Sequence, residues 1–226
     1  MVMTMLNRSR FNALILNIFF LVLFAVIVSN VQSNGLAVEI DRWVNAKIHL
    51  LYSPFLIGLM KLISDIISPF SLSILSLIIL AILIALKKWR ELLLLVFSLA
   101  AGVFLSDIIK IITHRPRPLN PLIEADDYSF PSRHAVLSII FFSLLIYFFK
   151  DKIKNKLLKK LFIAANVFIF LAVGLSRVYL NVHWLSDIIA GFALGLFILT
   201  LFILIFRLAK TKEKALCDSR NFTKIT

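Results

Sequence analysis

The sequence predicts an all-α integral membrane protein, folded as a six-transmembrane helical bundle. Hydrophobic residues make up 61% of the 226 residues, compared with roughly 45–50% apolar residues in soluble domains. The mean hydropathy is +0.97. Apolar runs long enough to cross a bilayer recur along the chain, and clusters of basic residues lie between them.

The net charge of +13 would suggest nucleic-acid binding in a soluble protein, but its distribution favours a membrane protein. Of the 25 Lys and Arg residues, 17 lie in four clusters that apolar segments separate. Cytoplasmic segments of membrane proteins carry such an excess of basic residues. We therefore expect the bilayer and no nucleic acid as a partner, a location in the plasma (inner) membrane, and both termini in the cytoplasm.

Charged or proline-rich segments separate the six expected spans. These spans are residues 11–28, 70–86, 92–112, 131–149, 161–175 and 187–206. A cleaved signal peptide is the alternative for the first span. Its apolar run of 18 residues exceeds the roughly 7–15 residues of a signal-peptide core, which favours an uncleaved helix.

The segment between the first two spans, residues 54–69, has a different pattern. Lys61, Ser64, Asp65 and Ser68 recur at helical spacing in an otherwise apolar sequence. A polar stripe of this kind is typical of an interfacial amphipathic helix, with one face in water. A partly buried seventh span is the alternative.

The sixth span begins with the chain's most informative pair of residues, His183 and Asp187. Four residues apart, they would share one face of a helix. The carboxylate can then accept the proton of one imidazole nitrogen and leave the other free to attack an electrophile. An ordinary ion pair at a helix end is the alternative. Gly191 and Gly195 continue the same register, so this face is also expected to pack closely against another helix.

Five basic residues lie in the two outer loops beside the sixth span, where the positive-inside rule disfavours them. They are Lys110, Arg115, Arg117, Arg133 and Arg177. With Ser132, His134 and His183 they can form one pocket suited to phosphate, because Arg offers a planar fork and Lys a point charge. One histidine would attack phosphorus and the other would protonate the departing oxygen.

No metal or other cofactor is expected in this pocket, because clustered Lys and Arg side chains repel a cation. The neighbouring loop contains two carboxylates, Asp126 and Asp127. We expect both to be solvated rather than catalytic.

Three segments resemble, in order, the signature motifs of the type 2 phosphatidic acid phosphatase family. They are Lys110 to Arg117–Pro118, Pro131–Ser132–Arg133–His134, and Ser176–Arg177 to His183 and Asp187. This family includes bacterial undecaprenyl-diphosphate phosphatases and phosphatidylglycerophosphate phosphatases, and it shares its core with vanadium haloperoxidases. The resemblance covers residues 70–206. We expect one integral-membrane domain, residues 1–226, that ends in a basic cytoplasmic tail, residues 207–226.

The resemblance implies a metal-independent membrane lipid phosphatase, with a phosphorylated lipid as substrate and its site at the outer membrane face. It implies that His183 is the nucleophile forming a phosphohistidine, that Asp187 orients it, and that His134 is the general acid. It assigns phosphate binding to Lys110, Arg117, Ser132 and Arg177. A lipid phosphotransferase with the same intermediate and a non-enzymatic small transporter are the alternatives.

One residue departs from the family pattern: glycine is usual where this chain has Arg133. The backbone N–H that the family uses is retained. The added guanidinium can grip the second phosphate of a diphosphate in a fork, which favours undecaprenyl diphosphate as substrate. Alternatively, Arg133 points into the outer interface and meets lipid headgroups.

Overall fold

In the computed structural model, which describes residues 2–125 and 127–222 and the side chains of 11–125 and 127–209, the regular elements are helices. The helices are α1 (Val2–Gln32), α2 (Leu36–Ile48), α3 (Pro54–Ile66), α4 (Pro69–Ala85), α5 (Trp89–Thr113), α6 (Arg133–Phe149), α7 (Lys156–Tyr179) and α8 (Leu185–Phe222). Short 3-10 turns follow α2, at His49–Leu51, and α6, at Lys150–Lys152.

Polar caps set the beginnings of several helices. Ser53 and Ser68 each accept a hydrogen bond from a backbone N–H of the first turn of α3 and α4, and a proline follows each cap. Asn155 caps α7 by accepting from two backbone N–H groups. These side chains satisfy donors that a helix start leaves without partners, and proline is pre-organised for the first helical position.

Five of the helices are each long and apolar enough to cross a bilayer. Their candidate spans are Phe11–Gln32, Trp89–Thr113, Arg133–Lys152, Lys156–Tyr179 and Leu185–Ala209. A bend of 42° joins α3 to α4, and the two together supply a sixth span if they are counted as one broken span. The predicted all-α bundle of membrane-spanning helices is confirmed.

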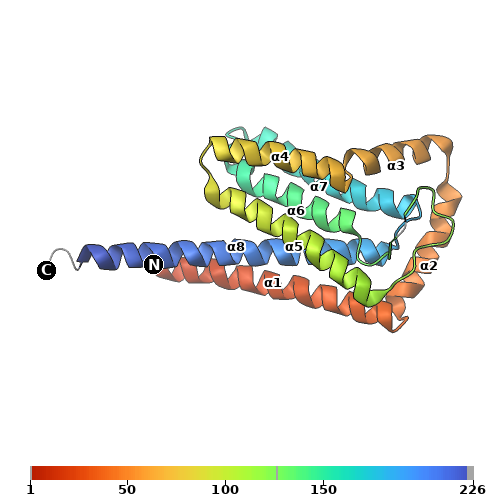
Figure 1. Cartoon of the computed structure of the whole chain (residues 1–226), viewed down its shortest axis with the longest axis horizontal. Coiled ribbons are helices and arrows are strands. Elements are labelled where there is room, and N and C mark those ends of the chain that lie inside the picture. Colours follow the sequence, from red (N-terminus) through yellow and green to blue (C-terminus); the bar gives the residue numbers. More distant parts are fainter. Residues whose placement is uncertain (1, 126, 223–226) are drawn as a thin grey trace.

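The surroundings of α3 differ from the expected aqueous interface at one position. Ser64, in the polar stripe, is buried and accepts a hydrogen bond from Arg177 of α7 at 2.6 Å. Asp65 is exposed, as expected. In Figure 1, α3 runs beside α7, whereas α2 crosses the end of the bundle. The stripe therefore combines an exposed carboxylate with an inward contact to α7.

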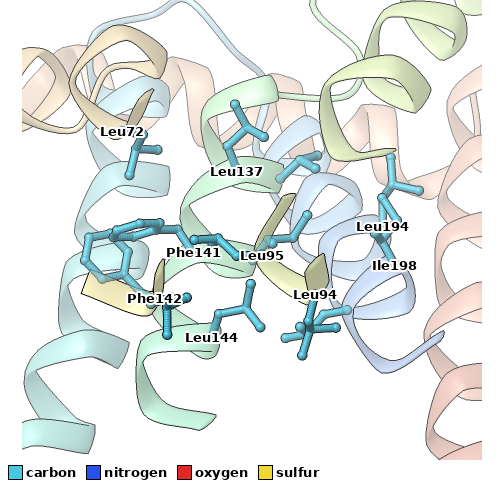
Figure 2. Packing of buried hydrophobic residues seen from close by; sticks show 13 residues of the cluster. Leu72, Leu94, Leu95, Leu137, Phe141, Phe142, Leu144, Leu194 and Ile198 are labelled. Atoms are coloured by element: carbon cyan, nitrogen blue, oxygen red, sulfur yellow. The ribbon is translucent and has the colours of Figure 1, made fainter. Parts of the chain in front are cut away.

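The hydrophobic core lies between α4, α5, α6 and α8, with α6 at its centre (Figure 2). Nine of the 17 residues of α6 are buried. The glycine face predicted for the sixth span packs on this helix. A Cβ added to Gly191 would lie 2.8 Å from the Ala135 Cβ, and one added to Gly195 would lie 2.9 Å from the Val136 carbonyl oxygen. Glycine therefore permits the close approach of α8 to α6.

The long helices α1 and α8 lie side by side, and α1 begins at the end of the bundle where α8 ends (Figure 1). The Asn17 side chain of α1 donates hydrogen bonds to the Phe197 carbonyl at 2.8 Å and to the Thr200 hydroxyl at 2.9 Å. Polar contacts of this kind fix the register of helices that share an apolar surface. Residues 180–184 and α2 lie at the opposite end.

Replacing Gly195 with alanine is expected to destabilise the bundle by about 1–3 kcal/mol, the usual cost of overpacking a core. The midpoint of thermal unfolding in detergent micelles should fall accordingly. Gly58→Ala on α3 is the matched control, because a Cβ there meets nothing within 4 Å. Equal midpoints for the two variants would contradict the close α6–α8 packing.

Candidate functional site

Two loops meet at the end of the bundle that α2 crosses: residues 114–132 between α5 and α6, and residues 180–184 between α7 and α8. Asn181 joins them. Its buried side chain donates to the carbonyls of Leu119 and Asn120 and accepts from Asn45 of α2. Its backbone is left-handed, with φ of 57°, a conformation that asparagine tolerates better than most residues. The position of His183, two residues further on, is thereby fixed.

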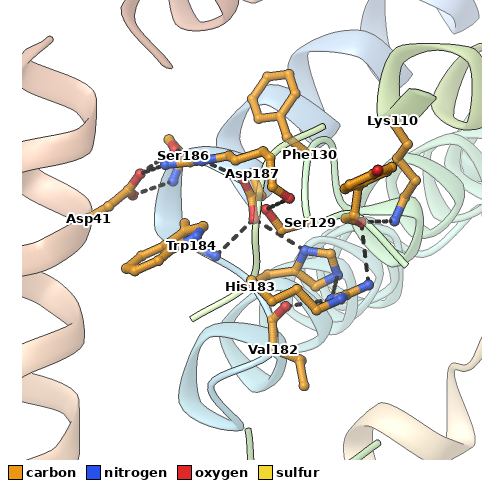
Figure 3. Close-up of polar contacts among 12 residues, drawn as sticks. Asp41, Lys110, Ser129, Phe130, Val182, His183, Trp184, Ser186 and Asp187 are labelled. Carbon is orange, nitrogen blue, oxygen red and sulfur yellow. Dashed lines mark hydrogen bonds and ion pairs between the residues drawn. The ribbon is translucent and has the colours of Figure 1, made fainter. Parts of the chain in front are cut away.

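His183 and Asp187 form the predicted pair at the beginning of α8 (Figure 3). The His183 Nδ1 lies 3.3 Å from the Asp187 Oδ2, and both side chains are buried. The same carboxylate oxygen accepts a hydrogen bond from the Trp184 N–H at 2.9 Å. Because Nδ1 donates to the carboxylate, the lone pair of the neutral imidazole is on Nε2. The Arg117 Nη1 lies 3.3 Å from this nitrogen.

The surroundings of His183 favour its neutral form. Burial lowers the pKa of the imidazole well below its usual value, and the charges of Arg117, Arg177 and Lys110 lower it further. At neutral pH, above that pKa, Nε2 therefore carries a lone pair rather than a proton. Such a nitrogen can act as a nucleophile.

A cavity of about 170 Å³ lies next to His183. Six residues that the sequence analysis selected line it: Lys110, Arg117, Arg133, His134, Arg177 and His183. Three polar atoms of predicted residues, the Ser132 hydroxyl, the Arg133 Nε and the Arg177 Nε, are buried without a hydrogen-bond partner among the described residues. A ligand with several acceptor oxygens would suit these donors.

The Asp127 carboxylate is exposed, as the sequence analysis expected, but it also has two basic partners at the cavity. It accepts a hydrogen bond from the Lys110 Nζ at 2.7 Å and also pairs with Arg117. Burial tends to raise the pKa of this carboxyl group, but the bonds and charges of those two cations outweigh it and lower the pKa to about 2. Asp126, placed in the same solvated loop by the sequence analysis, lies outside the described residues.

Arg115 is a correction to the sequence analysis, because it does not line the cavity. Its guanidinium lies behind the His183–Asp187 pair, with Nη1 2.5 Å from the Asp187 Oδ1 and Nη2 2.6 Å from the Asp41 Oδ2. Asp41, on α2, is 2% exposed and was not selected from the sequence. In the sequence, Asp41 is a carboxylate in a segment where polar and apolar residues alternate. Such a carboxylate lies on the exposed face of a helix as readily as on the buried one, so it gives no sign of a role at the site.

Arg133 lies at the rim of the cavity, where its guanidinium pairs with Asp107 of α5. The two side chains are 36% and 41% exposed. The Ser132 backbone N–H, at the start of α6, donates to the Asp187 carbonyl at 3.1 Å. Within the described residues, no group of three or more His, Cys, Asp or Glu side chains could hold a metal ion.

Residues 91–210, more than half of the chain, match the model of the PAP2 superfamily. The chain belongs to the PAP2 superfamily. It is 33% identical over 184 residues to phosphatidylglycerophosphatase B of Bacillus subtilis (strain 168). The match covers 79% of this chain and 87% of that protein. The resemblance based on three motifs is confirmed. The chain is thus a PAP2-type membrane lipid phosphatase, a metal-independent lipid phosphate hydrolase, and not a small transporter.

Two solved structures resemble this PAP2 phosphatase. The transmembrane PAP2 type phosphatidylglycerolphosphate phosphatase from Bacillus subtilis has a TM-score of 0.71 and 30% identity, and the match covers 84% of this chain and 93% of that one. Aquifex aeolicus LpxE has a TM-score of 0.57 and 21% identity, with 74% and 93% covered, and shares the fold.

An apolar groove of about 300 Å³ adjoins the cavity of this PAP2 phosphatase. It lies between α4 and α5, above Leu137 of α6, and is lined mainly by leucine, alanine and valine side chains. Pro69, at the start of α4, lines both the groove and the cavity. Exposed apolar side chains surround the groove on both helices, including Leu77 and Val103. A lipid chain can therefore lie in the groove while its headgroup enters the cavity.

Proposed function

We propose that this phosphatase hydrolyses the terminal phosphate monoester of a membrane lipid, with phosphatidylglycerophosphate as its substrate. The observation that carries the proposal is the buried His183, which Asp187 orients toward a cavity lined by four buried or half-buried cations. The apolar groove beside the cavity supports a lipid rather than a soluble phosphate. The headgroup is supported by the likeness to phosphatidylglycerophosphatase B of Bacillus subtilis, at 33% identity, and to the solved phosphatidylglycerolphosphate phosphatase of the same organism, at 30% identity.

The reaction proceeds in two steps through His183. Its Nε2 attacks phosphorus, an N–P bond forms, and the P–O bond to the lipid breaks. His134 protonates the departing lipid oxygen. In the second step His134 takes a proton from water, the water oxygen bonds to phosphorus, and the N–P bond breaks to release inorganic phosphate.

The charge that develops on the phosphoryl oxygens is stabilised by donors around the cavity. Lys110 and Arg117 exchange the Asp127 carboxylate for phosphate oxygens. The Arg177 Nε and the Ser132 hydroxyl, both buried without a protein partner among the described residues, supply two further donors. Arg117 also lies 3.3 Å from the attacking nitrogen, which places it beside the reacting phosphorus.

Undecaprenyl diphosphate is the second candidate substrate, and Arg133 is the observation that favours it. The side chain lines the cavity and bears the extra charge that a second phosphate would require. Its pairing with Asp107 speaks against this role, because the guanidinium is already neutralised at the rim. The monoester is therefore the preferred substrate.

The site is proposed to face away from the cytoplasm, with both termini in the cytoplasm. The charge distribution supports this orientation, since 17 of the 25 Lys and Arg residues lie in the segments assigned to the inner side. The fold is consistent with it, because α1 begins and α8 ends at the end of the bundle opposite to α2.

Removing the proposed nucleophile should abolish turnover. His183→Ala is expected to lower kcat for phosphatidylglycerophosphate by at least about 1000-fold, because loss of a nucleophile removes the covalent route. Phosphate release by purified protein, with and without EDTA, is the measurement. His49→Ala is the matched control, since His49 is exposed and far from the cavity in sequence. Turnover by His183→Ala, or EDTA inhibition that Mg²⁺ reverses, would contradict the mechanism.

The ion pair of Arg133 yields a prediction about substrate preference. If Asp107 holds the guanidinium at the rim, Arg133→Gly should change the kcat/KM ratio of diphosphate to monophosphate lipids less than about twofold. A direct bond to a second phosphate would make that change roughly tenfold or more, since charged hydrogen bonds contribute about 1.5–3 kcal/mol. Asp107→Asn is the companion variant. A tenfold fall of the ratio in Arg133→Gly would restore the diphosphate as substrate.

The orientation can be measured by cysteine labelling in intact cells. In a Cys217→Ser background, Leu119→Cys should react with an impermeant maleimide, because Leu119 is 84% exposed in the loop assigned to the outer side. Lys154→Cys, exposed in the basic loop between α6 and α7, should react after the cells are permeabilised. The reverse pattern would overturn the proposed topology.

A further inference from the structure

One buried carboxylate reaches the site from α2, a helix outside the three signature motifs. The Asp41 Oδ2 accepts hydrogen bonds from the Arg115 Nη2 at 2.6 Å and from the Ser186 hydroxyl at 2.5 Å. Its Oδ1 accepts from the Ser186 backbone N–H at 2.8 Å, at the first turn of α8. Figure 3 shows Asp41 facing Ser186 from across the bundle end. Asp41 therefore acts as an N-terminal cap for α8, supplied by another helix.

Arg115 connects Asp41 to the proposed catalytic pair. Its Nη1 donates to the Asp187 Oδ1 at 2.5 Å and to the Ser186 hydroxyl at 2.7 Å. The guanidinium thus lies between the carboxylates of two residues that are 2% and 0% exposed. It also stacks on the Trp184 ring, 5.6 Å from the ring centroid. A planar fork with several donors can hold both carboxylates at once, which a lysine could not.

The bond from Arg115 determines which Asp187 oxygen meets the imidazole. Because Oδ1 is bound to Arg115, Oδ2 is left for the His183 Nδ1 and the Trp184 N–H. Without Asp41, the guanidinium would lose its partner on α2 and could turn away with Asp187. The imidazole would then lose the contact that directs Nε2 toward the cavity.

We propose that Asp41 is a positioning residue of the phosphatase reaction, acting on His183 through Arg115 and Asp187. This inference rests on the proposed role of His183 as nucleophile. Asp41 itself does not line the cavity with the cations, so it contributes to turnover rather than to substrate binding. Partners of this kind, one step removed from the reacting group, typically change activity by about 10–100-fold at metal sites, where they orient histidine ligands in the same way.

A competing role for Asp41 is purely architectural, holding α2 on the bundle. The two roles differ in a double-mutant cycle. If Asp41 acts through Asp187, its loss should have little effect once Asp187 can no longer orient the imidazole. If Asp41 only supports the fold, its loss should lower activity by the same factor in both backgrounds.

The experiment compares Asp41→Asn in wild-type and Asp187→Asn backgrounds, with kcat and KM for phosphatidylglycerophosphate and the thermal midpoint in detergent as readouts. Asp41→Asn is expected to lower kcat by about 10–100-fold with KM within about twofold. In the Asp187→Asn background the further loss should be less than about threefold. Glu39→Gln, an exposed carboxylate on the same helix, should leave kcat unchanged.

Three results would overturn the positioning role. They are kcat losses of Asp41→Asn and Asp187→Asn that multiply fully in the double variant, an unchanged kcat in Asp41→Asn, and a rise in KM alone. If Asp41→Asn does not fold, Arg115→Lys replaces it, because lysine keeps the charge but loses the fork; the same non-additivity with Asp187→Asn is expected. The proposed function is tested separately, by measuring turnover of the wild-type protein, expected to be active, and of His183→Ala, expected to be inactive. If wild-type protein prefers undecaprenyl diphosphate, the cycle is measured on that lipid with the same criteria.

Discussion

A buried imidazole that stays neutral beside three cations is the constraint on which this site depends. Burial and the charges of Lys110, Arg117 and Arg177 lower the pKa of His183, so its Nε2 keeps a lone pair. These cations also give the cavity its affinity for an anion. The Asp187 carboxylate fixes the tautomer. The His183 ring therefore depends on cations on its cavity side, which help to keep it neutral, and on Asp187 on its other side, which orients it.

Charges alternate from the cavity to the far side of the bundle end. Behind the neutral imidazole lies Asp187, behind Asp187 lies Arg115, and behind Arg115 lies Asp41. Asp187, Arg115 and Asp41 each have an opposite charge as a neighbour, which lowers the cost of burying them away from water. In front of the imidazole, Asp127 pairs with Lys110 and Arg117. The single carboxylate of Asp127 thus offsets only part of the positive charge of these two cations.

Helix packing sets the distance between the two proposed catalytic histidines. His134 lies in the first turn of α6, and His183 precedes the first turn of α8. Gly191 allows these helix beginnings to approach, and the Ser132 N–H bonds to the Asp187 carbonyl across the gap. A side chain at Gly191 would meet the Ser132 carbonyl at 2.9 Å. The distance between the two histidines therefore depends on how closely α6 and α8 pack.

The sequence by itself determined the long apolar helices and the His183–Asp187 pair, because hydrophobic runs and four-residue spacing are local properties of the chain. It did not predict α2, the helix that carries Asp41. Tertiary structure decided which charges meet. Arg115 looks like Arg117 in the sequence, yet its partners Asp41 and Asp187 are 74 and 72 residues away. Asp127 and Arg133 likewise find partners on or near α5. Such pairings depend on which helices pack together. The pattern of charges along the chain does not encode this packing, because close contact of α6 with the glycines of α8 is what brings the loops together.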